Sequence, residues 1–274
     1  MKKLNLAYWH AGIIFDLNLI AKFFTSKYFK VGNAGDLFAC DLVRHLYGDI
    51  KIVNIPSRPR LFLVGSILSW PIKNDDVVYG IGFKKSSEKI NKIFNSNAIY
   101  SLRGPHSSKR VFFNSANLSM DPGTLVREVY GESIYENESF PQQSKTLHIP
   151  IHSKRYDKYN FPFNFDFCDI DDHPINVVRR ISKYERVVTS SLHGYIFARC
   201  LGKKVCAYYD ESNFFDDNYF KWIDFFSSIN EEHHLIHVPN ISDNSFISRP
   251  EINQSISDFN FPSKEFLINK KIIF

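Results

Sequence analysis

Cysteine and methionine are scarce in this sequence, and the cysteines do not form a metal-binding pattern. The 274 residues include four cysteines and two methionines. No two cysteines have the CxxC spacing, so the sequence predicts neither a structural zinc site nor a disulfide framework. We expect all four to be buried thiols. They are Cys40, Cys168, Cys200 and Cys206.

Long hydrophobic runs are also absent. No apolar stretch approaches the roughly 20 residues that a membrane-spanning helix needs. The chain opens with Lys2 and Lys3 but soon reaches Asn5 and His10, which does not fit the apolar core of a signal peptide. We therefore expect a cytoplasmic protein, with the inner face of the membrane as a narrower alternative.

A strong charge of either sign is missing as well. The formal net charge is +5, and lysine and arginine are scattered along the chain. This balance fits an anionic small substrate, a membrane surface or nucleic acid, and does not choose among them. A hydrophobic share of 44% and an aromatic share of 16%, with 26 Phe, indicate a globular chain and not a disordered one.

The order of predicted elements indicates an α/β fold. Apolar strand candidates alternate with helix candidates along the whole chain, which predicts two Rossmann-like domains facing each other across a cleft. The polar stretch 130–145 has the composition of a linker. We therefore predict an amino-terminal domain at residues 1–140 and a carboxy-terminal domain at residues 141–274.

Glycines follow two predicted strands without making a dinucleotide-binding fingerprint. Residues 61–64 and 77–81 are apolar runs typical of parallel strands covered on both faces, and the first run ends in Gly65 and Ser66. The pattern GxGxxG does not occur after any predicted strand. A nicotinamide or flavin cofactor is therefore not expected.

A metal site is not expected either. His233, His234 and His237 lie in an apolar run that is typical of a strand. No Cys or carboxylate pair near them completes a tetrahedral ligand set. We interpret them as structural histidines.

The richest pattern in the sequence is a strand, a polar turn and a helix within residues 185–198. Ser190, Ser191, Leu192, His193 and Gly194 follow a short apolar strand and open the helix. In an open α/β sheet such a turn faces the ligand crevice, and the N-terminus of the helix favours an anion. The alternative is a serine-rich helix cap with a satisfied histidine behind it.

Three further turns carry polar residues at the end of a predicted strand or the start of a helix. Asn33, Gly35 and Asp36 begin a helix, and they either face the same crevice as His193 or only cap that helix. Arg103 ends a strand before a proline-initiated helix, where it binds an anion or forms a salt bridge. Asp121 follows another strand end.

The order of these motifs resembles the polysaccharide pyruvyl transferase family. Two positions depart from its pattern: Ser191 stands where many members carry arginine, and Met120 where glycine is usual. The five matching segments are Asn33-Ala34-Gly35-Asp36, Leu102-Arg103-Gly104-Pro105, Met120-Asp121-Pro122, Ser190-Ser191-Leu192-His193-Gly194 and Phe220-Lys221-Trp222-Ile223-Asp224-Phe225.

The resemblance implies a fold, a reaction and roles for residues. The fold is GT-B-like, and the reaction moves a pyruvyl group from phosphoenolpyruvate to two hydroxyls of a sugar in a bacterial surface polysaccharide or its precursor, forming a cyclic ketal. It implies catalytic roles for His193, Arg103 and Asp36. The donor belongs to the carboxy-terminal domain, and the acceptor and Arg103 to the amino-terminal one. The implied substrate-binding residues are Asn33, Gly35, Gly65, Ser66, Asp121, Ser190, Ser191, Leu192, Gly194, Lys221 and Asp224.

Two other functions fit the same sequence. A GT-B glycosyltransferase would use a nucleotide sugar on a similar pair of domains, because a fold does not decide a function. A non-catalytic carbohydrate-binding protein would use aromatic faces such as Tyr208, Tyr209 and Trp222. For the transferase we expect no cofactor and no nucleic-acid partner; the acceptor is free, nucleotide-linked or lipid-linked, and the last would bring the protein to the membrane surface.

Overall fold

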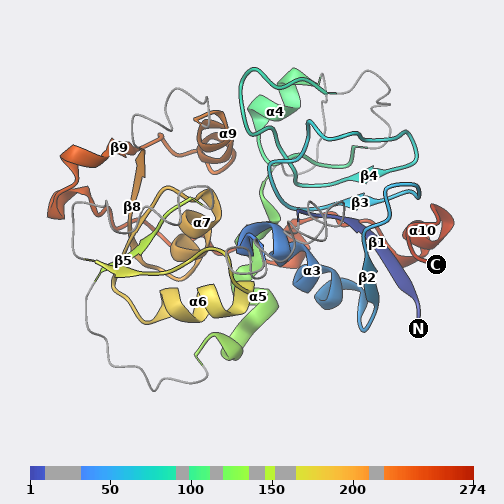
Figure 1. The fold of residues 1–274 in the computed structure, drawn as a ribbon, viewed down its shortest axis with the longest axis horizontal. Helices are drawn as coiled ribbons and strands as arrows, with labels where there is room; N and C mark the ends of the chain where they lie inside the picture. The colour runs from blue at the N-terminus through green and yellow to red at the C-terminus, as the bar shows by residue number, and fades with distance from the viewer. Residues whose placement is uncertain (10–31, 91–98, 112–119, 136–145, 152–164, 210–218) are drawn as a thin grey trace, which may run out of the picture.

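The computed structural model describes residues 1–9, 32–90, 99–111, 120–135, 146–151, 165–209 and 219–274. These residues form two parallel β-sheets with helices packed around them (Figure 1). The first sheet has the order β2-β1-β3-β4 and the second has the order β6-β5-β7-β8-β9. The strands are β1 (Lys3–Ala7), β2 (Lys51–Val53), β3 (Leu61–Phe62), β4 (Val77–Val78), β5 (Thr146–Ile149), β6 (Asp166–Phe167), β7 (Arg186–Thr189), β8 (Lys204–Tyr209) and β9 (Leu235–His237).

Helices connect and flank these strands. The α-helices are α3 (Ala34–Tyr47), α4 (Pro105–Arg110), α5 (Val126–Tyr130), α6 (Pro174–Ser182), α7 (Leu192–Cys200), α9 (Phe220–Ser228) and α10 (Lys264–Asn269). Single 3-10 turns are η2 (Pro122–Leu125), η3 (Gly131–Ile134), η6 (Val238–Asn240), η7 (Asp243–Ser245) and η8 (Ile256–Asp258). Within the described ranges, no helix is long and apolar enough to cross a membrane.

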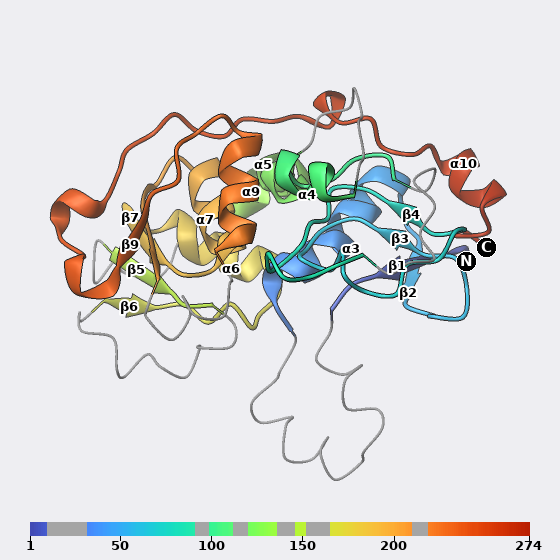
Figure 2. The same cartoon turned by 90° about the horizontal axis from the view of Figure 1, so that it is seen from above.

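Both sheets contribute to one apolar core. The central strands are buried on both faces, as their continuous apolar sequences predict, so Leu4, Leu61, Leu147 and Val187 all belong to a single cluster of buried residues. In Figures 1 and 2 the two sheets lie side by side, with α3 and α5 between them.

The start of α3 is hydrogen-bonded to the loop that follows β6 of the second sheet. The amide of Ala34 donates to the carbonyl of Ile170 at 2.9 Å, and the amide of Gly32 donates to the Asp171 carboxylate at 2.5 Å. Further along α3, Phe38 packs edge to face against Tyr130 of α5 and Phe197 of α7, with ring centroids 5.8 Å apart in each pair. Leu42 is buried in the core cluster to which strands of both sheets belong. This helix therefore links the two sheets, and its first turn lies where they meet.

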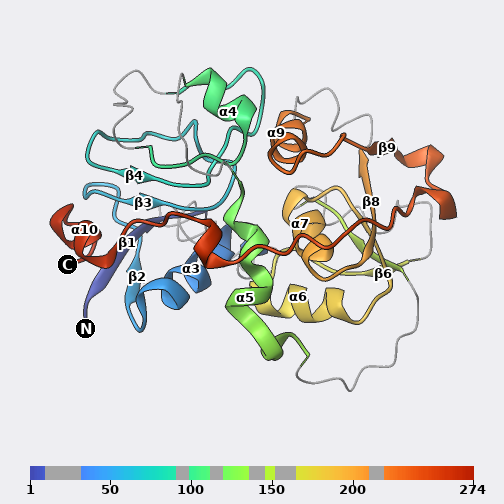
Figure 3. The ribbon, with the colours of Figure 1, turned by 180° about the vertical axis from the view of Figure 1, so that it is seen from behind.

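The end of the chain returns to the sheet in which the chain begins. The segment before α10 runs behind both sheets (Figure 3), and Phe274 then exchanges backbone hydrogen bonds with Lys3 at 2.8 and 2.9 Å. An antiparallel bridge joins Leu4 to Ile273. The predicted division between residues 140 and 141 stays a prediction. It assigned the last residues to the carboxy-terminal domain, whereas they pair with β1 of the first sheet.

The α/β class is confirmed: two parallel sheets with helices are compatible with Rossmann-like domains. The more specific GT-B arrangement stays an expectation. The four cysteines are free thiols, and Cys168, Cys200 and Cys206 are buried, whereas Cys40 is partly exposed.

Candidate functional site

A pocket of about 340 Å³ lies at the carboxyl ends of strands from both sheets. This is the edge at which open α/β sheets bind ligands. Seven of the residues that the sequence predicted for the site line it: Asn33, Asp36, Ser66, Ser191, Leu192, His193 and Lys221. Five lining residues were not predicted: Trp9, Ile67, Trp70, Lys84 and Ile151.

The turn after β7 uses its hydroxyls to hold the backbone. The Thr189 hydroxyl donates to the carbonyl of Ile149 at 2.7 Å and accepts from the amide of Ser191 at 3.0 Å. The Ser191 hydroxyl caps α7 by accepting from the amide of Gly194 at 3.3 Å, and the Ser190 hydroxyl accepts from the amide of Ile151 at 2.8 Å. The capping interpretation of these serines is therefore the one that describes their contacts.

His193 lies at the base of the pocket, in the first turn of α7. Its residue exposure is 7%, and its Nε2 is 3.5 Å from Oδ2 of Asp121. Asp121 is completely buried and caps η2 by accepting from the amide of Gly123 at 2.8 Å. Burial raises the pKa of Asp121, but His193, Arg103 and this amide outweigh burial and hold the pKa below its usual value. Asp121 therefore faces the imidazole in its carboxylate form, and it does not line the pocket.

Two glycines of the motifs make room for the polar side chains. A Cβ at Gly35 would overlap the His193 imidazole at Nδ1, so only glycine lets the start of α3 approach α7 this closely. Gly65 has a φ of +113°, and a Cβ there would lie 2.6 Å from the Asp36 carboxylate. Gly35 and Gly65 were predicted as substrate-binding residues, and the structure places them behind His193 and Asp36.

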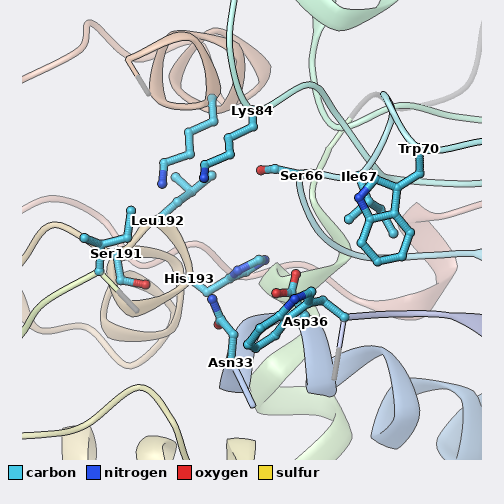
Figure 4. Close-up of a pocket in the computed structure, with 12 residues that line it drawn as sticks. Asn33, Asp36, Ser66, Ile67, Trp70, Lys84, Ser191, Leu192 and His193 are labelled. Atoms are coloured by element: carbon cyan, nitrogen blue, oxygen red, sulfur yellow. The ribbon is translucent and has the colours of Figure 1, made fainter. Parts of the chain in front are cut away.

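Asp36 and His193 point toward one another across the pocket (Figure 4). Burial raises the pKa of Asp36 to about 6, and nearby Asp121 acts in the same direction, while His193, Lys221 and Lys84 oppose it. A carboxyl group with such a pKa is present in both protonation states near neutral pH. It can therefore give or take a proton under physiological conditions.

Arg103 and Asp224 lie behind the pocket and not in its lining. Both side chains are fully buried, with Nε of Arg103 3.5 Å from Oδ2 of Asp224. Asp224 also accepts from the amide of Ser107 at 2.9 Å and from its hydroxyl at 2.5 Å, which attaches α4 to α9. Of the two interpretations of Arg103, the salt bridge is the one that describes its contacts. The guanidinium contacts the pocket lining through Ser66, to whose hydroxyl it donates at 2.6 Å.

Two lysines bring positive charge into the pocket. Lys221 stands in the first turn of α9 with 7% exposure, and Lys84 follows β4. Burial lowers the pKa of Lys221 to about 7, helped by the charges of Lys84 and Arg103. Sequence reasoning missed Lys84, because the apolar run predicted as a strand ends before it and Lys84 belongs to none of the matching motifs.

Other predicted side chains lie elsewhere. Tyr208 and Trp222, offered as sugar-binding aromatics, are buried in the core. The imidazole of His237 stacks on Tyr209 with ring centroids 5.3 Å apart. In the part of the chain that the structure describes, His, Cys, Asp and Glu form no group of three that could hold a metal ion.

Fold and pocket together define a class: an α/β protein with two parallel sheets and one polar pocket in which an imidazole, a titrating carboxyl group and two ammonium groups meet. The sequence profile of the polysaccharide pyruvyl transferase family matches residues 33–212. This match covers more than half of the chain and includes α3, η2 and the turn into α7. The chain therefore belongs to the polysaccharide pyruvyl transferase family, which implies a transferase that moves pyruvyl groups in polysaccharide biosynthesis. No curated protein and no solved structure matched the chain.

Proposed function

We propose that the protein transfers the pyruvyl group of phosphoenolpyruvate to two hydroxyls of one sugar, forming a cyclic ketal and releasing phosphate. The observation that carries this proposal is the meeting of His193, Asp36 and two lysines in one pocket of a pyruvyl transferase family member. The reaction requires proton transfer and the binding of two anionic groups, and these side chains are suited to both.

The reaction has two bond-forming steps. A proton is added to carbon 3 of the enol, and a sugar hydroxyl then forms a bond to the cationic carbon 2 and loses its own proton. The bond from carbon 2 to the phosphate oxygen breaks next, and the second hydroxyl closes the ketal ring. The two hydroxyl protons balance the proton added to carbon 3 and the one carried away by hydrogen phosphate.

Asp36 and His193 are the proposed proton-transfer groups. The raised pKa of Asp36 supplies a carboxylic acid near neutral pH, and the imidazole of His193 has ring nitrogens that can give or accept a proton. Asp121 is a positioning residue, because it touches the His193 ring and not the pocket. Either Asp36 or His193 protonates carbon 3, and the other accepts a hydroxyl proton.

The far side of the pocket suits the acceptor. Trp70 lies on the side away from Ser191 (Figure 4) and offers an apolar face on which a sugar ring can pack. The acceptor remains free, nucleotide-linked or lipid-linked in this proposal. A lipid-linked acceptor would bring the protein to the membrane surface.

The test is phosphate release from phosphoenolpyruvate by the purified protein, with and without candidate acceptor sugars. The proposal expects release only when an acceptor is present, together with a product that has gained one ketal-linked pyruvyl group by mass spectrometry. Product formed from a nucleotide sugar instead would support a glycosyltransferase. Binding of a sugar without turnover of either donor would support a non-catalytic protein.

A further inference from the structure

Lys84 and Lys221 come from different sides of the molecule but are brought together by packed aromatic rings. Lys84 follows β4 of the first sheet, and Lys221 stands on α9, which precedes β9 of the second. The residues just before them, Phe83 and Phe220, pack edge to face with ring centroids 6.4 Å apart. The Arg110 guanidinium lies over both rings, 4.7 and 5.0 Å from their centroids. The backbone beneath the two lysines is therefore fixed across the junction of the sheets.

Hydrogen bonds reinforce the same junction. The Lys84 amide donates to the Glu88 carboxylate at 2.7 Å, which orders the loop after β4. On the other side, His106 of α4 and Ser227 of α9 are 3.0 Å apart at their polar atoms. The placement of the two ammonium groups thus follows from the packing beneath them.

The two lysine side-chain nitrogens contact no acidic group directly among the described residues. No hydrogen bond or ion pair of either side-chain nitrogen occurs in that part of the chain. Asp36 is an acidic neighbour of both lysines, and its pKa is raised to about 6, while burial lowers the pKa of Lys221 to about 7. Near neutral pH the Asp36 carboxyl and the Lys221 amine are therefore both only partly ionised. Two cations held together in a buried site repel each other and lose hydration, a cost that a bound anion offsets.

Ser66 adds a third donor to the same space. Its hydroxyl oxygen accepts from Nη1 of Arg103 at 2.6 Å. A serine hydroxyl has one proton and two lone pairs, so this contact leaves the proton available to an acceptor in the pocket. Figure 4 shows the Ser66 hydroxyl and the Lys84 side chain directed into the pocket.

We propose that Lys84 and Lys221 together hold the phosphate group of the donor, with Ser66 as a third donor, and that the carboxylate of the donor binds elsewhere in the pocket. This assignment rests on the proposed function for the identity of the donor. Two ammonium groups suit a dianionic phosphate better than a singly charged carboxylate, because each adds a charge-assisted hydrogen bond. One lysine follows a strand of the first sheet and the other lies on a helix that precedes a strand of the second, so the bound phosphate contacts both sides of the junction.

The test compares the binding of inorganic phosphate and of pyruvate to the whole protein by titration calorimetry. Lys84→Met should weaken phosphate binding by at least about tenfold, since one of the two charge partners of the phosphate is lost, and should change pyruvate binding little. Lys84→Arg should retain most of the affinity. The matched control is Lys89→Met, an exposed lysine outside the pocket that loses the same charge.

A second measurement uses stability. Phosphate should raise the melting temperature of the wild type, because a ligand that binds only the folded state stabilises it, and Lys84→Met should remove most of that rise. Lys221→Met should do the same, and its melting curve without phosphate reports whether this buried variant is folded. Lys84 is partly exposed, so the test does not depend on the buried position.

The outcomes separate the inference from the proposed function. Unchanged phosphate affinity in Lys84→Met, an equal loss in Lys89→Met, or a loss for pyruvate alone would each overturn the assignment. If acceptor-dependent phosphate release from phosphoenolpyruvate occurs while Lys84→Met binds phosphate normally, the proposed function stands and the assignment of the phosphate to the two lysines is wrong. If phosphate binding depends on both lysines but no acceptor supports phosphate release from phosphoenolpyruvate, the two lysines do bind phosphate and the proposed function is wrong.

Discussion

Gly35→Ala tests the packing that places His193. Gly35 lies in the first turn of α3, where alanine would ordinarily favour the helix by up to about 1 kcal/mol. In the structure the added methyl group would overlap the imidazole of His193. Overpacking of this kind costs about 1–3 kcal/mol, so it outweighs the helix propensity, and we expect a net loss of roughly 0–2 kcal/mol.

The same substitution should affect turnover more than stability. The imidazole must move away from Asp36 or Asp121 to admit the methyl group, and acid–base groups typically contribute about 10²–10⁴-fold to rate. We expect acceptor-dependent phosphate release to fall by at least about 100-fold, near the loss expected for His193→Ala. Gly123→Ala is the comparison: its Cβ would lie 3.3 Å from Cδ2 of His193, a tight contact but not an overlap.

A double-mutant cycle with His193→Ala gives the sharpest outcome. His193→Ala removes the imidazole, whose Nδ1 would overlap the added methyl group, but it keeps the Cβ of residue 193, which would lie 2.6 Å away. Gly35→Ala should therefore cost less stability in this background, without becoming stabilising. The destabilisation by Gly35→Ala should therefore be smaller in the His193→Ala background than in the wild type. Urea denaturation of the four proteins measures the coupling; equal effects in both backgrounds would show that Gly35 and His193 do not touch and would refute this account of the site.

Three further predictions test other parts of the site. Arg103→Lys should lower turnover and stability together, because lysine cannot contact Ser66, Asp224 and the Phe83 carbonyl at once; wild-type rate and unfolding free energy would remove Arg103 from the site. Asp36→Asn should abolish the acid–base function yet stabilise the fold at pH 7. The raised folded-state pKa of Asp36 means that its contribution to stability falls as pH rises from about 4 to about 6, so wild type and variant should converge near pH 4 in urea denaturation, and parallel curves would contradict this. Acceptor-dependent phosphate release should survive extensive treatment with a chelator, and activity restored only by an added divalent ion would overturn the expectation of a metal-free reaction.

Local sequence signals determined the elements and their caps. Val187 and Val188 with the serines after them predicted a strand, a turn and a helix, because such signals lie within a few residues of one another. Asn33 caps α3, as its sequence position indicated, and Asp121 caps η2 at the strand end where the sequence placed it. The family resemblance also followed from motifs of this local kind, and the family match confirmed it.

Only the tertiary structure decided which motif residues face the pocket. Arg103 looked like an anion-binding residue at a strand end, but its guanidinium is enclosed by Ser66, Phe83 and Asp224 from other elements. Lys84 belongs to no motif, and it enters the site because Phe83 packs against Phe220, far away in the chain. A side chain's surroundings depend on such long-range packing, and the sequence close to a residue does not contain that information.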